Sequence, residues 1–158
     1  MDEEEAAAAR GEDGGLYMLA AEDVFRRLER RPDLNLNVSM FEIYGQKVRD
    51  LLAEGKELAA LEDGKGVLQL VGLAQESCLD MDAFLHTTNV GRSARSTTAT
   101  DANATSSRSH AAMLLRLVDN ESGKVCGKFS FIDLAGAERG ADHETGNAKT
   151  KMVSSLLL

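Results

Sequence analysis

The chain has 158 residues and a mass of 17.0 kDa, enough for one domain of ordinary size. Hydrophobic residues make up 43% and charged residues 28%, a globular composition that excludes a fibrous or wholly disordered chain. The formal net charge is −8, from 18 basic and 26 acidic residues, and this acidity argues against a nucleic-acid-binding protein.

Residues 1–15 form an acidic lead of charged residues, Ala and Gly, which we expect to be disordered. Within it, residues 1–13 hold six acidic residues against Arg10, a charge of −5, so the rest of the chain carries only −3. From Leu16 to Leu28 the apolar spacing predicts a helix. The buried face of this helix is expected to comprise Leu16, Leu19, Ala20, Val24 and Leu28.

Two apolar runs predict strands in the first half of the chain. Leu36 to Tyr44 begins with alternating apolar and polar side chains, as a strand does. A second, short strand is expected from Val67 to Val71. Between them lie a short apolar patch, Val48 to Leu52, and a polar, glycine-punctuated stretch over residues 53–66, where no element is predicted.

A second helix is predicted from Asp80, a suitable N-cap, to about Val90. Its buried stripe is expected to consist of Met81, Phe84 and Leu85. Residues 91–109 show no periodicity and are rich in Ser, Thr, Ala and Arg, which predicts a long loop. Loops of this length are usually functional or disordered.

The last predicted elements form a hairpin. His110 to Val118 favours a strand, although its Ala, Leu and Met also allow a helix. Residues 121–124 fit a hairpin turn, and Lys128 to Leu134 is expected to be a buried strand. Strands and helices mixed in this order predict a layered α/β domain.

The two cysteines, Cys78 and Cys126, are too few for a disulfide scaffold or a zinc cluster. We expect reduced thiols in a cytosolic protein. No apolar run approaches the roughly 18–20 residues that span a bilayer, and the acidic N-terminus is the opposite of a signal peptide. We therefore expect no membrane partner.

Two segments have the chemistry of a phosphate sensor. Residues 103–110 bring serine hydroxyls from a loop into a strand, and residues 133–138 leave the carboxyl end of a strand with Asp133 and Gly136. An Asp at that place can hold Mg²⁺ through water, and a glycine lets its N–H approach a phosphate. Each segment alone has a plain alternative, a common turn or a flexible serine-rich loop. Together they predict a nucleotide switch.

Here the sequence resembles the kinesins, the microtubule-dependent ATPase motors. Residues 103–110, which end Ser-Ser-Arg-Ser-His, resemble their switch I, and residues 131–139 resemble the strand and switch II. Met-Phe-Glu-Ile-Tyr at 40–44, followed by Asp-Leu-Leu at 50–52, resembles a third signature of the family. The resemblance runs from about Gly15 to Met152. Stretches 61–65, 71–73 and 138–142 look most like the internal-motor branch, whose members depolymerise microtubule ends.

The resemblance implies ATP and Mg²⁺ as ligands and a nucleotide-binding role for four residues. Ser107 would coordinate Mg²⁺, and Asp133 would hold the ion through water. Asn103 would lie near the phosphates, and the Gly136 N–H would sense the γ-phosphate.

The resemblance also implies catalytic and microtubule-binding roles. Ser106 would help to position the attacking water, and Arg108 would pair with Glu138 as a latch between the two switches. A buried ion pair of this kind makes more sense as a switch than as a net stabiliser. Residues 62–72 correspond to a loop that touches the microtubule in the family, with Lys65 as their only basic residue.

One family feature is absent from this sequence. None of its Gly-Lys pairs fits the phosphate loop Gly-x-x-x-x-Gly-Lys-Ser/Thr. We therefore expect residues 16–158 to form an incomplete, P-loop NTPase-like, three-layer α/β motor fold that lacks the phosphate-loop strand and the C-terminal part. An exposed sheet edge, poor autonomous stability, weak ATP affinity and negligible hydrolysis should follow.

Three hypotheses are left. The chain is a segment of an ATP-dependent microtubule motor; or a non-catalytic, kinesin-like protein that binds tubulin or another partner without nucleotide; or, least in keeping with residues 106–110, another nucleotide switch such as a GTPase. The expected partner is the microtubule, in the cytoplasm and on the cytoskeleton. Any homodimerisation is expected through segments outside this chain.

Overall fold

The computed structural model describes residues 15–45, 47–99 and 109–135. Within these residues the chain forms two helices and seven strands. They are α2 (Leu16–Leu28), β1 (Leu34–Tyr44), β2 (Lys47–Asp50), β3 (Lys56–Glu62), β4 (Leu68–Val71), β5 (Glu76–Cys78), α3 (Met81–Ala99), β6 (Ser109–Asp119) and β7 (Val125–Asp133).

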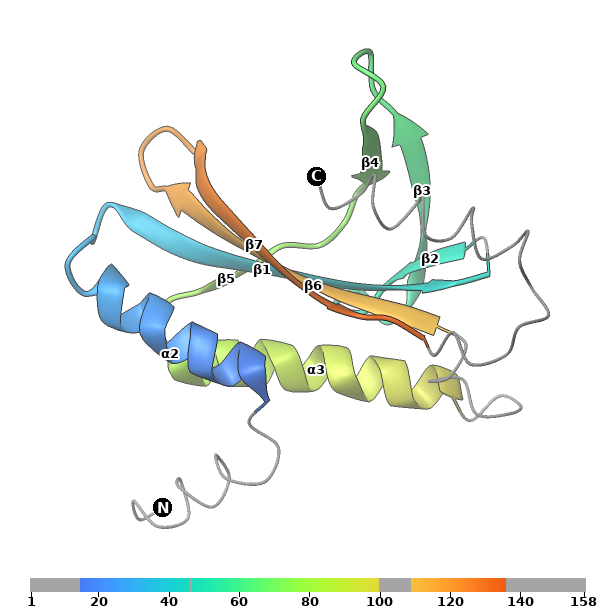
Figure 1. Ribbon diagram of the computed structural model, residues 1–158, viewed down its shortest axis with the longest axis horizontal. Helices are drawn as coiled ribbons and strands as arrows, with labels where there is room; N and C mark the ends of the chain where they lie inside the picture. The colour runs from blue at the N-terminus through green and yellow to red at the C-terminus, as the bar shows by residue number, and fades with distance from the viewer. Residues whose placement is uncertain (1–14, 46, 100–108, 136–158) are drawn as a thin grey trace, which may run out of the picture.

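The strands form one sheet in the order β4-β3-β2-β1-β6-β7, and every described pairing is antiparallel. β6 pairs along one edge of β1, whereas β5 and β2 share the other edge. Both helices lie on one face of this sheet, and the β3–β4 hairpin projects on the other side (Figure 1). The expected α/β architecture is confirmed, and the described residues supply the sheet and one helical layer.

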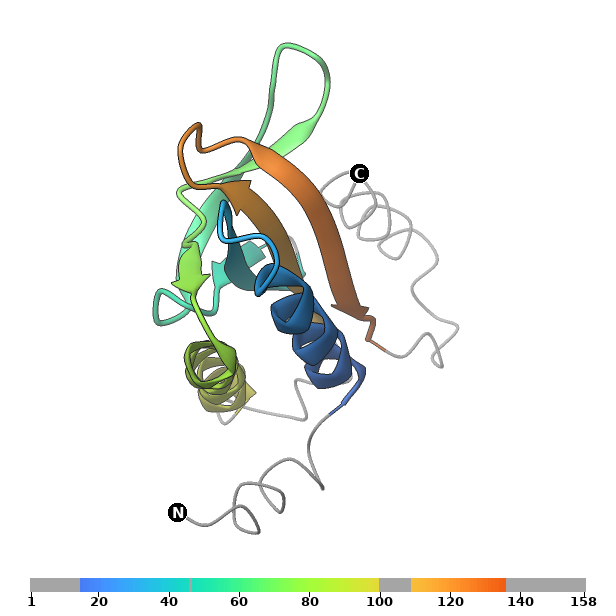
Figure 2. The same ribbon diagram turned by 90° about the vertical axis from the view of Figure 1, so that its left-hand side faces the viewer.

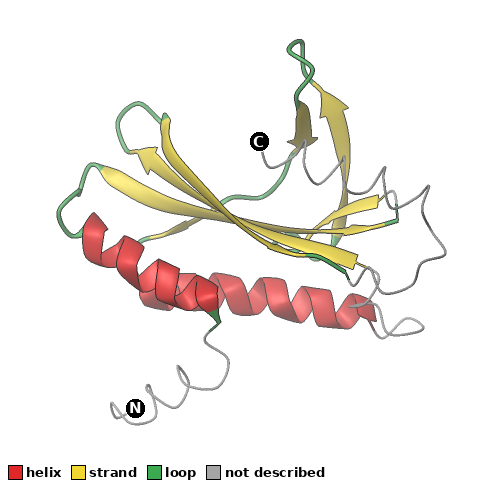
Figure 3. Cartoon of the chain, in the orientation of Figure 1, coloured by secondary structure: helices red, strands yellow, loops and turns green. Residues whose placement is uncertain are grey.

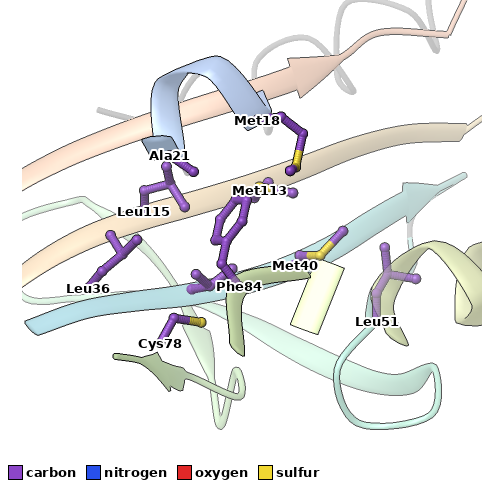
Figure 4. Packing of buried hydrophobic residues seen from close by; sticks show 10 residues of the cluster. Met18, Ala21, Leu36, Met40, Leu51, Cys78, Phe84, Met113 and Leu115 are labelled. Carbon is purple, nitrogen blue, oxygen red and sulfur yellow. The ribbon is translucent and has the colours of Figure 1, made fainter. Parts of the chain in front are cut away.

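Alternation along β1 builds a core on each face of the sheet. Leu36 and Met40 belong to the larger cluster, together with Phe84 of α3 (Figure 4). Val38 belongs to the same cluster. Phe41 and Ile43 belong to a second cluster, which includes Leu58 of the β3–β4 hairpin. Because both sides of this strand are buried, β1 is apolar over most of its length.

The helices cover different parts of the sheet (Figure 2). α2 packs against β7, where the Tyr17 and Phe131 rings meet edge to face with centroids 6.3 Å apart. α3 packs against β1 and β5, and its Phe84 is fully buried in the larger cluster. None of the helices in the described residues has the length and apolar character that crossing a bilayer requires.

Most of the predicted elements are present at or near their predicted bounds (Figure 3). The helix over Leu16–Leu28 is confirmed, and the first strand begins two residues earlier than expected. Residues 109–119 form a strand, not a helix. Asp80 caps α3, since its Oδ1 accepts a hydrogen bond from Ala83 N at 2.8 Å.

The predicted buried face of α2 is partly wrong. Leu16 and Leu19 are 73% and 63% exposed, whereas Met18 and Ala21 are buried. The helix is turned so that Tyr17 meets Phe131 of the sheet and Phe25 meets Phe84 of α3, which places the two leucines on the outer side.

Two predictions of irregular structure are also wrong. Residues 91–99 continue α3 rather than starting a loop, because Ala, Ser and Thr are tolerated in a helix whose other face is anchored by packing. Residues 56–62 form β3, a half-exposed strand whose burial pattern is too polar to be recognised from apolar alternation.

The strand predicted over residues 128–134 is present, but the prediction that it is buried is wrong. β7 exists, but Phe129 is 56% and Ile132 43% exposed. The reason is position: among the described strands β7 pairs only with β6 and forms the edge of the sheet.

Candidate functional site

Three elements end at one corner of the molecule. β6 begins at Ser109 and β7 ends at Asp133, and because the two strands are antiparallel these ends lie side by side, with Ala111 opposite Asp133. The last turns of α3 reach the same corner. The two segments singled out for phosphate sensing therefore leave the sheet at neighbouring points.

Arg95 of α3 connects both strands. Its Nη1 lies 2.7 Å from Oδ2 of Asp133, and its Nη2 donates a hydrogen bond to the Ser109 carbonyl oxygen at 3.4 Å. The Arg95 side chain is only 25% exposed, whereas that of Asp133 is 66% exposed. The guanidinium is thus fixed within the fold and orients a carboxylate that faces solvent.

A further hydrogen bond ties the segment after β7 to β6. The backbone N–H of Ala135 donates to Nδ1 of His110 at 3.0 Å. As an acceptor, this ring nitrogen carries no proton in the arrangement. His110 thereby holds the chain close to β6 just before the expected phosphate-sensing glycine.

Of the predicted nucleotide-site residues, the structure places Asp133 at this corner. The others lie outside the described residues: Asn103, Ser106, Ser107, Arg108, Gly136 and Glu138.

Arg95 was missed because no apolar pattern predicts that the helix continues beyond Val90. A signal was present. Arg95 lies 11 residues after Phe84, three helical turns along the same stripe, with Gly91 between them. A basic residue in phase with a buried aromatic residue indicates an arginine held against the body of the protein.

The donor atoms at the corner suit a Mg²⁺ site only in part. A carboxylate oxygen is the ligand type that Mg²⁺ prefers, and one carboxylate is enough for a contact through water. Asp133 provides it. In the parts of the chain that the structure describes, no group of three or more His, Cys, Asp or Glu side chains could hold a metal ion by itself.

Lys65 is exposed at the tip of the β3–β4 hairpin, far from this corner (Figure 1). The tip is closed by Asp63, whose carboxylate accepts hydrogen bonds from the N–H groups of Val67 at 3.0 Å and Lys65 at 2.9 Å. These hydrogen bonds lower the pKa of Asp63. The turn is therefore ordered by its own backbone, and it presents Lys65 to solvent.

Two comparisons with known proteins bear on these observations. The family model described as the kinesin motor domain matches residues 3–157. A solved structure, described as "Structure of a fast kinesin: Implications for ATPase mechanism and interactions with microtubules", matches at 26% sequence identity with a TM-score of 0.64. The match covers 84% of this chain and 40% of that chain, so this sequence spans less than half of the solved protein.

Proposed function

This chain belongs to the kinesin motor domain family, and from that premise we propose that it is a segment of an ATP-dependent microtubule motor. In this proposal residues 103–110 and 133–139 are its two nucleotide-sensing segments, within a motor segment that starts at residue 16. The observation that carries the proposal is the pair of contacts made by Arg95, which join the end of the first segment to the start of the second at one corner.

The described contacts support separate roles for the metal ion and for Arg95 at the corner. Bound Mg²⁺ would neutralise the phosphates of ATP. Arg95 holds one oxygen of Asp133, which orients the carboxylate for a water on the ion. Because the same guanidinium binds the Ser109 carbonyl, a displacement at residue 109 changes the geometry of the carboxylate.

We assign the remaining roles to residues outside the described part. Ser107 would coordinate Mg²⁺, and Asn103 and the Gly136 N–H would contact the phosphates. Ser106 would position the attacking water, and Arg108 and Glu138 would form the latch that closes one segment on the other. An order–disorder change of such segments is how nucleotide switches report a γ-phosphate.

Binding of a fluorescent ATP analogue, with Mg²⁺ and with EDTA, tests the nucleotide site. We expect weak binding that Mg²⁺ strengthens, and we expect Asp133→Asn to weaken the Mg²⁺-dependent part by about tenfold. Asp82→Asn is the matched control, because Asp82 is an exposed carboxylate in the first turn of α3, at the other end of the helix that carries Arg95. Equal binding by both variants would contradict the role of Asp133, and substantial ATP hydrolysis would contradict the expected inactivity.

Within the family we propose the internal-motor branch, which shortens microtubules from their ends. The support is the resemblance of residues 61–65, 71–73 and 138–142, of which the first lies within the projecting hairpin and the second at its end. Microscopy of stabilised microtubules would measure end shortening by a complete motor that contains this segment. We expect Lys65→Ala to reduce microtubule binding and Lys124→Ala, in the exposed turn before β7, to leave it unchanged.

A second candidate function is supported by the lack of a Gly-Lys-Ser/Thr loop in the sequence. The chain would then be a non-catalytic protein that binds tubulin or another partner without nucleotide. Co-sedimentation with microtubules separates the two functions, because a nucleotide-free interaction is unchanged by ATP and by Asp133→Asn. For the motor segment we propose the cytoplasm, on microtubules, as the location.

A further inference from the structure

His110 joins the two strands that meet at the corner. β6 and β7 pair as far as Ala111 opposite Asp133, and past this pair the N–H of Ala135 donates a hydrogen bond to Nδ1 of His110 at 3.0 Å. Ala135 is therefore held by a side chain rather than by a further rung of the strand pairing. It lies between Asp133 and Gly136, both of which we assign above to the nucleotide site.

The donor in this hydrogen bond fixes the protonation state of the ring. A backbone N–H can only donate, so Nδ1 of His110 must offer a lone pair, and the neutral ring carries its proton on Nε2. A second proton would enter at Nδ1, the atom that accepts the bond. Two N–H groups would then point at each other, and the contact with Ala135 would be lost.

The described neighbours of His110 on its own face of the sheet are apolar. Ile43 of β1 lies opposite His110 and belongs to the second cluster. Ala112 is the next residue of β6 on this face, and Ile132 of β7 lies opposite Ala112. The imidazole is therefore surrounded by the sheet in a position where the hydrogen bond to Ala135 is not replaced easily by water.

The carboxylates of the two neighbouring strands point to the other face. Glu42 of β1 and Asp133 of β7 both lie opposite Ala111, the residue after His110, and side chains alternate along a strand. Arg95 approaches Asp133 from that other face, where the helices pack. These three charged groups therefore do not face the imidazole.

The charged residues that share the face of His110 stand further away. Asp50 of β2 lies two strands from β6, and its carboxylate accepts two backbone hydrogen bonds. Lys56 of β3 lies opposite Asp50, one strand further. Arg116 and Lys128 lie opposite each other toward the far end of β6 and β7. In the described residues, the contact with Ala135 thus depends on the proton at Nδ1 more than on a neighbouring charge.

We propose that His110 is a positioning residue that holds Ala135 only while its imidazole is neutral, so that protonation releases Ala135. Among side chains, histidine is the one that ordinarily changes its charge at about pH 6–7. The contact therefore responds to small changes of pH near neutrality. Its effect on nucleotide binding rests on the function proposed above, because it acts through the neighbours Asp133 and Gly136.

Two variants separate the acceptor from the ionisable ring. His110→Asn places Oδ1 near the position of Nδ1 and cannot gain a proton, whereas His110→Leu has no acceptor. In NMR of the complete chain, the Ala135 amide should exchange about tenfold more slowly in the unmodified chain than in His110→Leu at about pH 8, and at the same rate at about pH 5.5. His110→Asn should keep the slow exchange at both pH values.

The nitrogen chemical shifts of the imidazole give a measurement that needs no variant. At about pH 8 they should show Nδ1 of His110 without a proton and Nε2 with one. A proton on Nδ1 at that pH would overturn the proposal. So would equal exchange of Ala135 in the unmodified chain and in His110→Leu, or the same dependence on pH in the unmodified chain and in His110→Asn.

Binding of a fluorescent ATP analogue with Mg²⁺ measures the effect on the nucleotide site. Between about pH 8 and about pH 6 the affinity should fall by about threefold more in the unmodified chain than in His110→Asn, a comparison in which the titration of the nucleotide itself cancels. His86→Asn is the matched control, because His86 is exposed on α3, and its pH profile should equal that of the unmodified chain.

The two proposals fail in different ways. Equal pH profiles of nucleotide binding in the unmodified chain and in His110→Asn would overturn the role of His110 at the nucleotide site. If Mg²⁺-dependent binding is absent at every pH while the exchange of Ala135 behaves as expected, the proposed function fails, and the role of His110 in holding Ala135 is upheld.

Discussion

Asp50 shows how a residue in a family-like signature can act within the fold. Its side chain is fully buried at the end of β2. Oδ1 accepts a hydrogen bond from Leu52 N at 2.9 Å, and Oδ2 accepts one from Ala74 N at 2.7 Å. The carboxylate thus connects the turn after β2 to the segment that leads into β5. Two backbone N–H donors therefore fix the conformation of the segment Asp-Leu-Leu.

Replacing Asp50 tests this role. Asp50→Ala leaves two backbone N–H groups without their acceptor, which should lower the free energy of unfolding by about 2–4 kcal/mol. Glu57→Ala removes an exposed carboxylate paired with Lys47 and should cost no more than about 0.5 kcal/mol. Urea unfolding followed by circular dichroism measures both, and similar midpoints for the two variants would contradict the structural role of Asp50.

The two cysteines differ in their surroundings. Cys78 is buried, and its thiol donates a hydrogen bond to Oγ1 of Thr87 at 3.6 Å. Burial raises the pKa of the Cys78 thiol, whereas Cys126 is exposed near the start of β7.

This difference predicts selective labelling. At neutral pH a thiol reagent should modify Cys126 rapidly and Cys78 only when the chain unfolds, because the thiolate is the reactive form. Mass spectrometry of the labelled peptides over time distinguishes the two sites. Equal rates in the native chain would show that the β1–β5 region is open to solvent.

At the scale of elements, α3 lies very close to β1 at Gly91. A Cβ atom added to Gly91 would overlap Sδ of Met40 and come within 2.7 Å of its Cε. Met40 is itself buried in the larger cluster. The absence of a side chain on Gly91 thus leaves the space that the end of the Met40 side chain occupies.

A double substitution tests this close approach. Gly91→Val should lower the free energy of unfolding by about 1–3 kcal/mol through overpacking, and Met40→Ala by about 2–5 kcal/mol through a cavity. Because the alanine makes room for the valine, the double variant should lose clearly less free energy of unfolding than the two single variants lose together. Additive losses in urea unfolding would mean that the two residues do not share this space.

The turn between β6 and β7 depends on Asp119. Its Oδ1 accepts hydrogen bonds from the hydroxyl of Ser122 at 2.6 Å and from Ser122 N at 2.7 Å. These bonds, the hydroxyl first, lower the pKa of Asp119, and Gly123 completes the turn with a φ of +66°.

Stability should therefore depend on the charge of Asp119 in acid. A lowered pKa in the folded state stabilises the fold above the unfolded pKa of about 3.9, and this contribution is lost as the pH falls through the folded pKa. Asp119→Asn keeps an acceptor without that titration. The difference in urea midpoint between the two chains should be constant from pH 7 to about pH 5 and shrink below; a difference that does not change would contradict the assignment.

At the scale of the whole molecule, β1 and β6 form the central strand pair of the sheet. They pair over their full lengths, from Leu34 opposite Asp119 to Tyr44 opposite Ser109, and both contribute to the clusters on the two faces of the sheet. We expect their amides to exchange most slowly with solvent and those of the β3–β4 hairpin to exchange fast. Slower exchange in the hairpin, measured by mass spectrometry, would contradict this order.

Elements with strong apolar patterns could be predicted from the sequence, and those that depend on neighbours could not. β1 and β6 were recognisable because both of their faces are buried. β3 was missed because its partners, not its own side chains, make it a strand. The burial of β7 was overestimated because apolar composition does not reveal whether a strand has one neighbour or two.

The same limit applies to the candidate site. Asp133 was predictable because it directly follows an apolar strand and precedes a glycine. Arg95 was not, because its role requires that α3 continue past Val90 and bring a side chain 38 residues away in sequence to Asp133. Long-range partners of this kind follow from topology rather than from local pattern.

The length of α3 has its own consequence. The helix spans 19 residues, about 28 Å, from its Asp80 cap to the corner where Arg95 meets Asp133. One residue inserted between Phe84 and Arg95 would turn the guanidinium by about 100° around the helix axis, away from the carboxylate, without changing any residue of the corner. The geometry of that corner is therefore encoded in a count of residues, and insertions or deletions within α3 should be far less tolerated than substitutions on its outer face.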